Sequence, residues 1–203
     1  MKKFLLILYI VIELIPHLAI ALPNTNLQKR LNKVSSFYSN FTQLVTTDKG
    51  ALVHKSIGEI WFKLPNLFNW HVTSPDESIL ISDGKCLWFY NPSLEQVTIT
   101  SVDIANRDTP LTLISCNDTA VLNRYYIRQI KDIFYLIPKS KKNNLKEFVI
   151  NVSPTGTINS FTSVNKNGLS ILYKLYNHHS CLINNNFFHF LLPKGVQIDD
   201  QRE

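Results

Sequence analysis

From Gly50 onward, the chain is a succession of short runs rich in β-branched and aromatic residues, separated by turn sequences. The strongest hairpin signal is Asp83-Gly84, which lies between the runs 79–82 and 86–90. Turns this short can join antiparallel strands, whereas parallel neighbours need a long crossover. The pattern therefore predicts an antiparallel sheet of about ten or eleven strands, spaced as in an all-β sandwich or barrel. The other runs expected to form strands are 57–63, 67–73, 96–100, 124–130, 133–138, 145–152, 157–164, 169–176 and 187–192.

Ahead of these runs, residues 26–41 carry a helical periodicity. Apolar side chains recur every three or four residues, and polar side chains occupy the other side. This spacing predicts an amphipathic helix with one apolar stripe, for which Thr25 or Asn26 can supply the N-cap oxygen. The stripe consists of Leu27, Leu31, Val34, Tyr38 and Phe41.

A second, shorter helix is expected between residues 101 and 119, where the succession of strands is interrupted. Asp108-Thr109-Pro110 is typical of a helix start, and apolar residues follow it until about Cys116. A helix inserted in the middle of a sheet protein must cover an apolar surface. Its apolar residues are Leu111, Leu113 and Ile114.

The N-terminus has the three parts of a secretory signal peptide. Lys2 and Lys3 precede an apolar run at 4–12, and Ala19-Ile20-Ala21 provides a cleavage signal. The alternative is a membrane anchor, but the run is shorter than the roughly 20 apolar residues that a spanning helix needs. We therefore expect cleavage after Ala21, with residues 1–21 as signal peptide and 22–203 as one exported domain. A Cys does not follow the cleavage site, which argues against a lipid-anchored precursor.

The composition excludes several classes of protein. Hydrophobic residues make up 45% of the chain, enough apolar surface for a core, so the bulk of the chain is not disordered. The formal charge is +6, and its densest cluster is Lys-Ser-Lys-Lys at 139–142. This cluster is compatible with an anionic partner, but the following Asn143 and Asn144 favour a solvated hairpin loop. Scarce Arg and the export signal argue against nucleic-acid binding.

Motifs for catalysis or metal binding are weak. The sequence has none of the common nucleophile-elbow, phosphate-loop or zinc motifs, and a metal-like cluster is limited to His178, His179 and Cys181. Adjacent His residues on a strand point to opposite faces, which disfavours a shared ion. We therefore expect no metal and no cofactor.

The cysteines Cys86, Cys116 and Cys181 are widely spaced. An oxidising compartment would permit one disulfide among them, and the alternative is that they are small buried hydrophobic residues.

Carboxylates lie between predicted strands at Asp76, Glu77 and Asp83, where exposed turns are expected. Asp83 already has a structural role before Gly84. Near the C-terminus, Asp199-Asp200 favours a solvated tail. One hypothesis left open is a periplasmic hydrolase or metal-binding enzyme that uses His178, His179 and these acidic loops.

The strands are unusually rich in aromatic residues, which has two interpretations. They form the core of a β domain, or the helices lie over the mouth of a curved sheet and enclose an apolar ligand cavity. The residues are Trp61, Phe62, Phe68, Trp70, Trp88, Phe89, Tyr90, Phe148, Phe161, Tyr173, Tyr176, Phe187, Phe188 and Phe190.

A series of motifs along the whole mature chain resembles LolA, the periplasmic outer-membrane lipoprotein carrier family. The longest is WFKLPNLFNW at 61–70, followed by PDESI at 75–79, SDG at 82–84 and LWFYNP at 87–92. Further matches are VSSF at 34–37, FTQ at 41–43, EQV at 95–97, DTP at 108–110, FVIN at 148–151, GTI at 156–158, PKGV at 193–196 and DDQ at 199–201.

This resemblance implies an incomplete antiparallel β-barrel with short helices as a lid over a hydrophobic cavity. It implies a monomeric periplasmic chaperone that catalyses no reaction and needs no cofactor. Its partners would be triacylated lipoproteins, an inner-membrane ABC-type releasing complex and an outer-membrane lipoprotein receptor. The receptor itself shares this fold but is lipid-anchored, which the sequence does not match.

Carried over position by position, the resemblance also implies the cavity and lid residues. These are Phe68, Trp70, Leu80, Leu111, Ile114 and Phe161. Leu64 stands where the family usually has an Arg that holds the lid closed through hydrogen bonds, and Leu has no side-chain donor. Either the protein latches through apolar contacts, or it holds cargo differently and hands it on less efficiently.

Overall fold

The computed structural model describes residues 23–102, 114, 119–141 and 144–202. Its helices with assigned bounds are α2 (Pro23–Leu31), α5 (Thr119–Leu122) and the 3-10 helices η1 (Pro92–Leu94) and η2 (Asn185–Phe188). The strands are β1 (Ser36–Thr46), β2 (Leu52–Lys63), β3 (Leu67–Ser74), β4 (Ser78–Asp83), β5 (Cys86–Asn91), β6 (Gln96–Ser101), β7 (Tyr125–Ile130), β8 (Ile133–Pro138), β9 (Leu145–Val152), β10 (Ile158–Asn165), β11 (Ser170–Ser180) and β12 (Gln197–Asp200).

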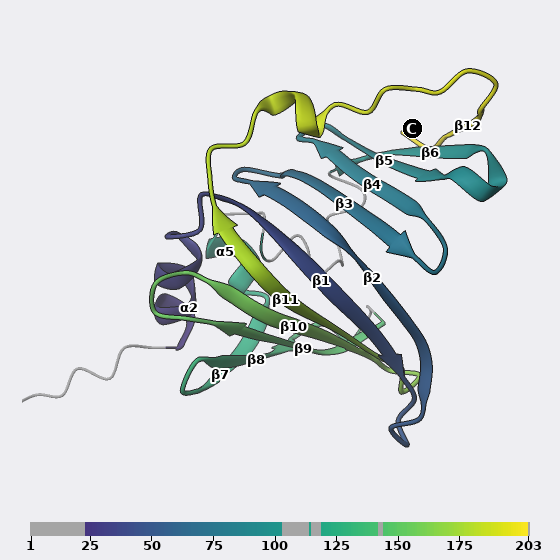
Figure 1. Ribbon diagram of the computed structural model, residues 1–203. Coiled ribbons are helices and arrows are strands. Elements are labelled where there is room, and N and C mark those ends of the chain that lie inside the picture. Colours follow the sequence, from purple (N-terminus) through teal and green to yellow (C-terminus); the bar gives the residue numbers. More distant parts are fainter. Residues whose placement is uncertain (1–22, 103–113, 115–118, 142–143, 203) are drawn as a thin grey trace, which may run out of the picture.

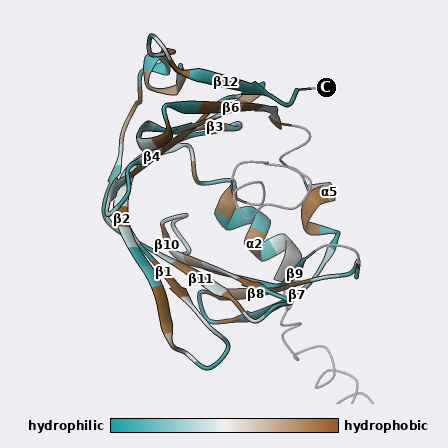
Figure 2. Cartoon of the chain, turned by 90° about the vertical axis from the view of Figure 1, so that its right-hand side faces the viewer, coloured by the Kyte–Doolittle hydropathy of each residue, from teal (hydrophilic) through white to brown (hydrophobic). Residues whose placement is uncertain are grey.

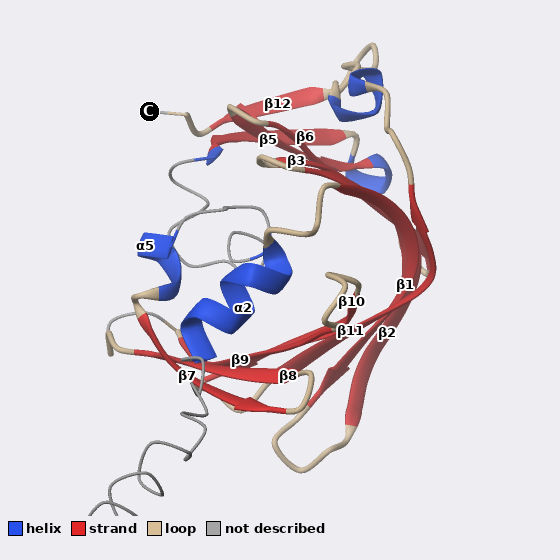
Figure 3. Cartoon of the chain, turned by 90° about the vertical axis from the view of Figure 1, so that its left-hand side faces the viewer, coloured by secondary structure: helices blue, strands red, loops and turns tan. Residues whose placement is uncertain are grey.

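All these strands form one sheet in the order β12-β6-β5-β4-β3-β2-β1-β11-β10-β9-β8-β7 (Figure 1). Neighbours are antiparallel, except that β12 runs parallel to β6. The sheet curves strongly, and α2 and α5 lie on its concave side (Figures 2 and 3). Because β12 and β7 are separate edges, the sheet is an open barrel. The mainly β, incomplete-barrel prediction is confirmed.

The alternation along β3 shows how the sequence selects the concave face. Phe68 and Trp70 are buried, whereas Asn69 and His71 between and after them point to the other face. Trp70 pairs with Ile60 on β2 and with Leu80 on β4, so the apolar row continues across the strands. The strand expected over 67–73 is therefore confirmed.

The helix expected over 26–41 is wrong in its second half. The helix α2 begins at Pro23 and ends at Leu31, and β1 begins at Ser36. From there burial alternates, with Phe37, Ser39 and Phe41 inward, because β1 pairs on both sides with β2 and β11. The periodicity of Tyr38 and Phe41 fitted a helix, but sheet pairing prevails.

Smaller differences occur at the ends of elements. The expected cap role of Asn26 is wrong, since this residue lies inside α2 and its Nδ2 donates to Gln129 Oε1 at 2.7 Å. The strand expected over 187–192 is also wrong, because η2 occupies its start. The tail expected at Asp199-Asp200 is instead part of β12. The predictions for 1–21, Asp108-Thr109-Pro110, Leu111, Cys116 and Lys142 lie outside the described residues.

Other expectations hold. Asp83-Gly84 does join two strands, β4 and β5. Lys139 and Lys141 are exposed in the loop after β8. The described cysteines, in contrast, differ from both alternatives: Cys86 and Cys181 are free thiols, and Cys181 is exposed and therefore not a buried hydrophobic residue. In the part of the chain that the structure describes, no helix has the length and apolar character needed to cross a bilayer.

The C-terminal segment, residues 181–201, covers part of the convex face. Phe187 stacks on Trp61 with ring centroids 5.7 Å apart, and Phe190 stacks on Trp88 at the same distance. The Nδ2 atom of Asn69 donates to the carbonyl of Phe187 at 2.9 Å. The segment then ends as β12 against β6, so it protects one edge of the sheet.

Polar contacts of Arg30 fix α2 to the half of the sheet that contains β7, β8 and β9. The buried Arg30 donates from Nη1 to Asp132 Oδ1 and to the carbonyl of Val152, each at 2.6 Å. Its guanidinium also lies over the Phe134 ring, 5.2 Å from the centroid. These contacts are directional, so they set the position of the helix more narrowly than apolar packing does.

We expect Arg30→Ala to lower the free energy of unfolding by about 2 kcal/mol, because it leaves the Val152 carbonyl unpaired while the half-exposed Asp132 regains water. The midpoint of thermal unfolding should fall by roughly 6 °C. Lys29→Ala, one residue earlier and exposed, is the control and should change stability by less than about 0.5 kcal/mol. Equal effects of both substitutions would contradict the anchoring role of Arg30.

Candidate functional site

The concave face carries a continuous group of rings, here called the aromatic cluster. Its members come from five strands and are Phe41, Trp70, Phe148, Phe161 and Tyr173. Trp70 lies at its centre, with ring centroids 4.4 Å from Phe41 and 4.9 Å from Tyr173. Tyr173 stacks in turn on Phe161 at 4.8 Å. Offset and edge-on contacts of this kind stabilise ring packing, and the rings belong to the buried apolar interior.

A glycine in the middle of β2 makes room for this arrangement. A Cβ atom at Gly58 would lie 2.6 Å from Cζ of Phe41 and 2.1 Å from the backbone oxygen of His71. Both distances are shorter than van der Waals contact, so a larger residue would displace the Phe41 ring or the neighbouring strand. Gly58 therefore allows the Phe41 ring to approach the β2 backbone next to Trp70.

The helices cover the same surface. Leu27 and Leu31 on α2 and Leu122 on α5 are buried in one cluster with the concave-face residues. An apolar face made partly by a sheet and partly by two short helices can be enlarged by moving a helix, whereas a surface within the sheet is fixed by hydrogen bonds. The arrangement is suited to binding a flexible apolar ligand.

The structure brings most of the sequence-predicted cavity residues together. Phe68, Trp70, Ile114 and Phe161 are buried in the apolar cluster. Leu80 and the latch-position residue Leu64 are half-buried and pack against it. Leu111 lies outside the described residues.

Sequence reasoning missed Phe41 and Tyr173 as members of the site. Phe41 was assigned to a helix stripe, and Tyr173 was one aromatic residue among many. The register places both near Trp70, because Phe41 lies beside Gly58 on β2 and Tyr173 pairs with Phe161 on β10. A glycine inside a strand pattern was the available signal for the Phe41 contact.

The electrostatics of the cluster are those of an apolar environment. Burial raises the pKa of the Tyr173 phenol to about 12, because the charged form would lose its hydration. The tyrosine therefore stays neutral near pH 7 and contributes ring surface rather than charge.

The histidines do not assemble a catalytic or metal site. His178 stacks on Phe37 at 4.7 Å, whereas His179 lies beside Tyr38 at 6.2 Å, and the two neighbours point to opposite faces of β11 as expected. Burial, and then the neighbouring His179, lower the pKa of His178. Among the described residues, no group of three His, Cys, Asp or Glu is placed to hold a metal ion.

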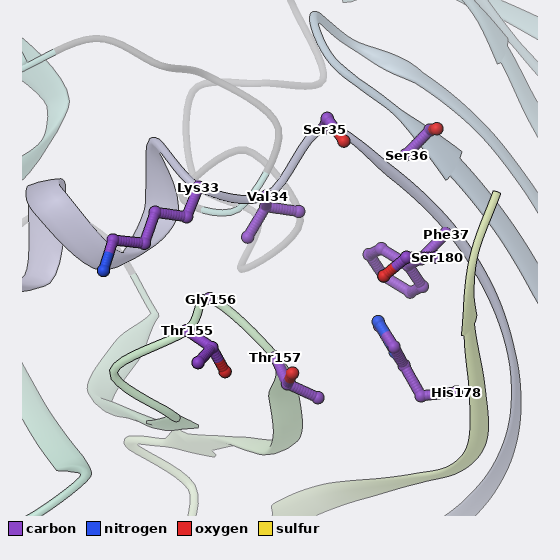
Figure 4. Close-up of a pocket in the computed structure, with 10 residues that line it drawn as sticks. All are labelled: Lys33, Val34, Ser35, Ser36, Phe37, Thr155, Gly156, Thr157, His178 and Ser180. Carbon is purple, nitrogen blue, oxygen red and sulfur yellow. The ribbon is translucent and has the colours of Figure 1, made fainter. Parts of the chain in front are cut away.

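A small polar pocket of about 40 Å³ lies beside His178 (Figure 4). It has room for about one water molecule. Its lining residues in the described chain are Lys33, Val34, Ser35, Ser36, Phe37, Thr155, Gly156, Thr157, His178 and Ser180. A carboxylate or thiol is not among these residues, so the pocket lacks the carboxylate that orients His in a Ser–His–Asp arrangement and the thiol of a Cys–His pair.

The acidic loops have other partners. Glu77 Oε1 is 2.8 Å from Nε2 of His71, in an exposed pair at the β3–β4 turn. Burial by itself would raise the pKa of Asp83, but hydrogen bonds from the backbone N–H groups of Cys86 and Lys85 and from Trp88 Nε1 outweigh it and lower that pKa. Asp83 thus closes the β4–β5 turn, and the hydrolase hypothesis finds no support in the geometry.

Comparison with known proteins agrees with this arrangement. A family model described as "Outer membrane lipoprotein carrier protein LolA" matches residues 32–191. The outer-membrane lipoprotein carrier protein of Edwardsiella ictaluri (strain 93-146) is 47% identical over 203 residues, and that of Yersinia pestis is 48% identical over 202 residues. Both matches cover 100% of each chain.

Solved structures share the fold at low sequence identity. A LolA superfamily protein from Nitrosomonas europaea has a TM-score of 0.50 and 12% identity, and the match covers 84% of this chain and 99% of that one. An uncharacterized conserved protein from Thermus thermophilus has a TM-score of 0.54 and 11% identity, with coverage of 87% and 98%.

The burial of Tyr173 predicts a loss of stability in alkali. The unfolded chain releases the phenolic proton near its ordinary pKa of about 10, whereas the folded chain keeps it until about 12. The contribution of Tyr173 is therefore fully present below pH 10 and is lost as the pH rises toward 12, by up to about 3 kcal/mol. Urea unfolding across this range measures it. Tyr173→Phe should lose less stability over the same interval, and an equal loss in both proteins would show that the phenol is not buried.

Proposed function

The chain belongs to the LolA family of outer-membrane lipoprotein carrier proteins, and from this premise we propose that it is a periplasmic chaperone for lipoproteins. It binds the acyl chains of lipoproteins released from the inner membrane and transfers them to an outer-membrane lipoprotein receptor. The observation that carries the proposal is the aromatic cluster around Trp70, a buried apolar layer on the concave side of an open sheet, which short helices cover.

The physical need for such a carrier follows from the acyl chains. Each CH₂ group left in water costs about 0.8 kcal/mol, so a triacylated protein does not cross an aqueous compartment unescorted. An apolar face shared by a sheet and movable helices can shield these chains and still give them up to a tighter acceptor. This task involves no covalent change, and we propose no catalytic residue.

The proposed location depends on the N-terminus. We propose that residues 1–21 are a signal peptide, removed after Ala21, and that residues 22–203 act in the periplasm. The cargo would come from an inner-membrane ABC-type releasing complex. We propose that the carrier acts as a monomer.

The contacts of Leu64 favour a latch made of apolar contacts over a different way of holding cargo. Its side chain packs against the apolar cluster that includes Ile114, and its N–H donates to the carbonyl of Ser35 at 2.9 Å. We propose that closure in this chain rests on apolar contacts. Such contacts lack direction, and acyl chains can replace them without leaving a buried donor unpaired.

Cargo binding provides the direct test. We expect the processed protein to form a 1:1 complex with a triacylated lipoprotein in native mass spectrometry, and the complex to disappear when the acyl-bearing Cys of the cargo is replaced. Leu80→Glu should weaken the complex at least tenfold, because it puts a carboxylate on the half-buried apolar face.

The matched control is Leu94→Glu on η1, where the leucine is 66% exposed and outside the cluster. Binding should change less than twofold there. An unacylated cargo that binds as well as the acylated one would refute the carrier function.

The latch can be tested with Leu64→Arg. We expect this variant to lose about 1 kcal/mol of stability, because it replaces a half-buried apolar side chain, and not to speed cargo transfer to the outer-membrane receptor. Transfer from the loaded carrier is followed over time, with Leu94→Arg as the exposed control. Faster transfer by Leu64→Arg at unchanged loading would contradict an apolar latch.

A further inference from the structure

The hairpin between β1 and β2 extends well beyond its neighbour β3. Pairing of β2 with β3 begins at Ile57 opposite Ser74, so residues 52–56 are paired with β1 alone within the described chain. Five residues of strand span about 17 Å. Figure 1 shows this hairpin at the end of the sheet opposite the C-terminal segment. We call residues 47–56 the β1–β2 tip.

The tip is ordered by hydrogen bonds of its own. The N–H of Thr47 donates to the carbonyl of Ala51 at 2.9 Å, and the N–H of Gly50 donates to the carbonyl of Thr47 at 3.0 Å. The turn beyond β1 is therefore a fixed shape. It holds its side chains in place next to the β10–β11 turn.

Two aliphatic side chains face water at the tip. Leu52 and Val53 are each 59% exposed and, as consecutive residues of a strand, point to opposite faces of the hairpin. The end of this projection is therefore apolar on both faces, and it can bury both side chains only by entering an apolar medium end-on.

Two exposed cations, Lys49 and Lys55, lie on the tip with these aliphatic residues. Lys166 is on the neighbouring β10–β11 turn, where its Nζ donates to the carbonyl of Lys141. The two turns lie side by side, because a Cβ atom at Gly168 would be 3.0 Å from Cβ of Asp48. Asp48 is the one carboxylate within residues 47–56.

Other carboxylates lie at the base of the tip. Asp76 and Glu77 follow Pro75, which lines a shallow pocket together with Lys55, and Glu77 is paired with His71. The strand between Ile57, opposite Ser74, and Leu52 is longer than the Debye length of about 8 Å at physiological salt, so these charges are largely screened at the end of the tip although they lie near Lys55.

From this arrangement we propose that the β1–β2 tip is a membrane-contact site for a bilayer that contains anionic phospholipid. Leu52 and Val53 enter the headgroup region, while Lys49 and Lys55 lie against the lipid phosphates. Charge complementarity selects this partner over a second copy of the chain. Two such edges would bring like charges together, and edge lysines are a common device against strand pairing.

The contact is expected to be weak and reversible. Each lysine near an anionic surface strengthens binding by about fivefold, and two aliphatic side chains are far fewer than a stable anchor requires. Such a site would orient the protein at a membrane without retaining it. The proposal stands on the tip alone and is independent of the acyl-binding surface.

The test is flotation of the processed protein with vesicles. We expect binding to vesicles of phosphatidylcholine and phosphatidylglycerol at a ratio of about 3:1, at least tenfold weaker binding to phosphatidylcholine alone, and loss of binding at about 1 M salt. Leu52→Ser with Val53→Ser should weaken binding at least tenfold, and so should Lys49→Glu with Lys55→Glu.

Matched controls distinguish the effect of the tip from the effects of exposed apolar area and net charge elsewhere on the protein. Tyr126→Ser with Ile137→Ser removes another exposed apolar pair, on β7 and β8. Lys29→Glu with Lys194→Glu makes the same charge change at exposed positions elsewhere. Both controls should bind within twofold of the parent, and all variants should keep their cargo complex. Equal losses in tip and control variants would overturn the proposal, as would a tip-dependent dimer in place of vesicle binding.

Discussion

The whole sheet depends on one strand, β1, which is hydrogen-bonded along its length to β2 on one side and to β11 on the other. It joins the half of the sheet formed by β2–β6 to the half formed by β7–β11. At its middle, Ser39 is fully buried and donates to the carbonyl of Tyr176, 137 residues away in the chain. Because β1 fixes Phe41 between the two halves of the sheet, the rings that both halves contribute meet around it.

The concave face combines two kinds of interaction with different tasks. Polar contacts at the rim, from Arg30 to Asp132 and from Asn26 to Gln129, define where α2 lies. Apolar contacts underneath, from Leu27 and Leu31, fill the space but do not require specific partners. A ligand with apolar chains can replace the apolar contacts of Leu27 and Leu31. The polar contacts of Arg30 and Asn26 meanwhile keep α2 in its position on the sheet.

Much of this architecture was predictable from local patterns. Phe68 and Trp70 were expected in the apolar interior, and the Asp83-Gly84 hairpin indicated antiparallel order. The helix expected over 26–41 was wrong in its second half, because the spacing of Tyr38 and Phe41 suits a helix and a strand alike and pairing decides between them. Likewise β12 was missed, since its parallel partner β6 is about one hundred residues earlier in sequence. Phe41 and Tyr173 escaped the site prediction for the same reason, because only the register of distant strands brings them to Trp70.

The position of β12 has a consequence for the order of events in folding. Strand β6 is complete halfway along the chain, yet the strand that covers its edge is nearly the last part to be synthesised. Until then β6 presents open backbone groups, and Trp61 and Trp88 on the convex face lack their partners Phe187 and Phe190. An unfinished or truncated chain therefore exposes both an unpaired strand and aromatic surface, the combination that promotes intermolecular β-sheet association. Only a chain that includes this final segment can therefore cover the β6 edge and the rings of Trp61 and Trp88.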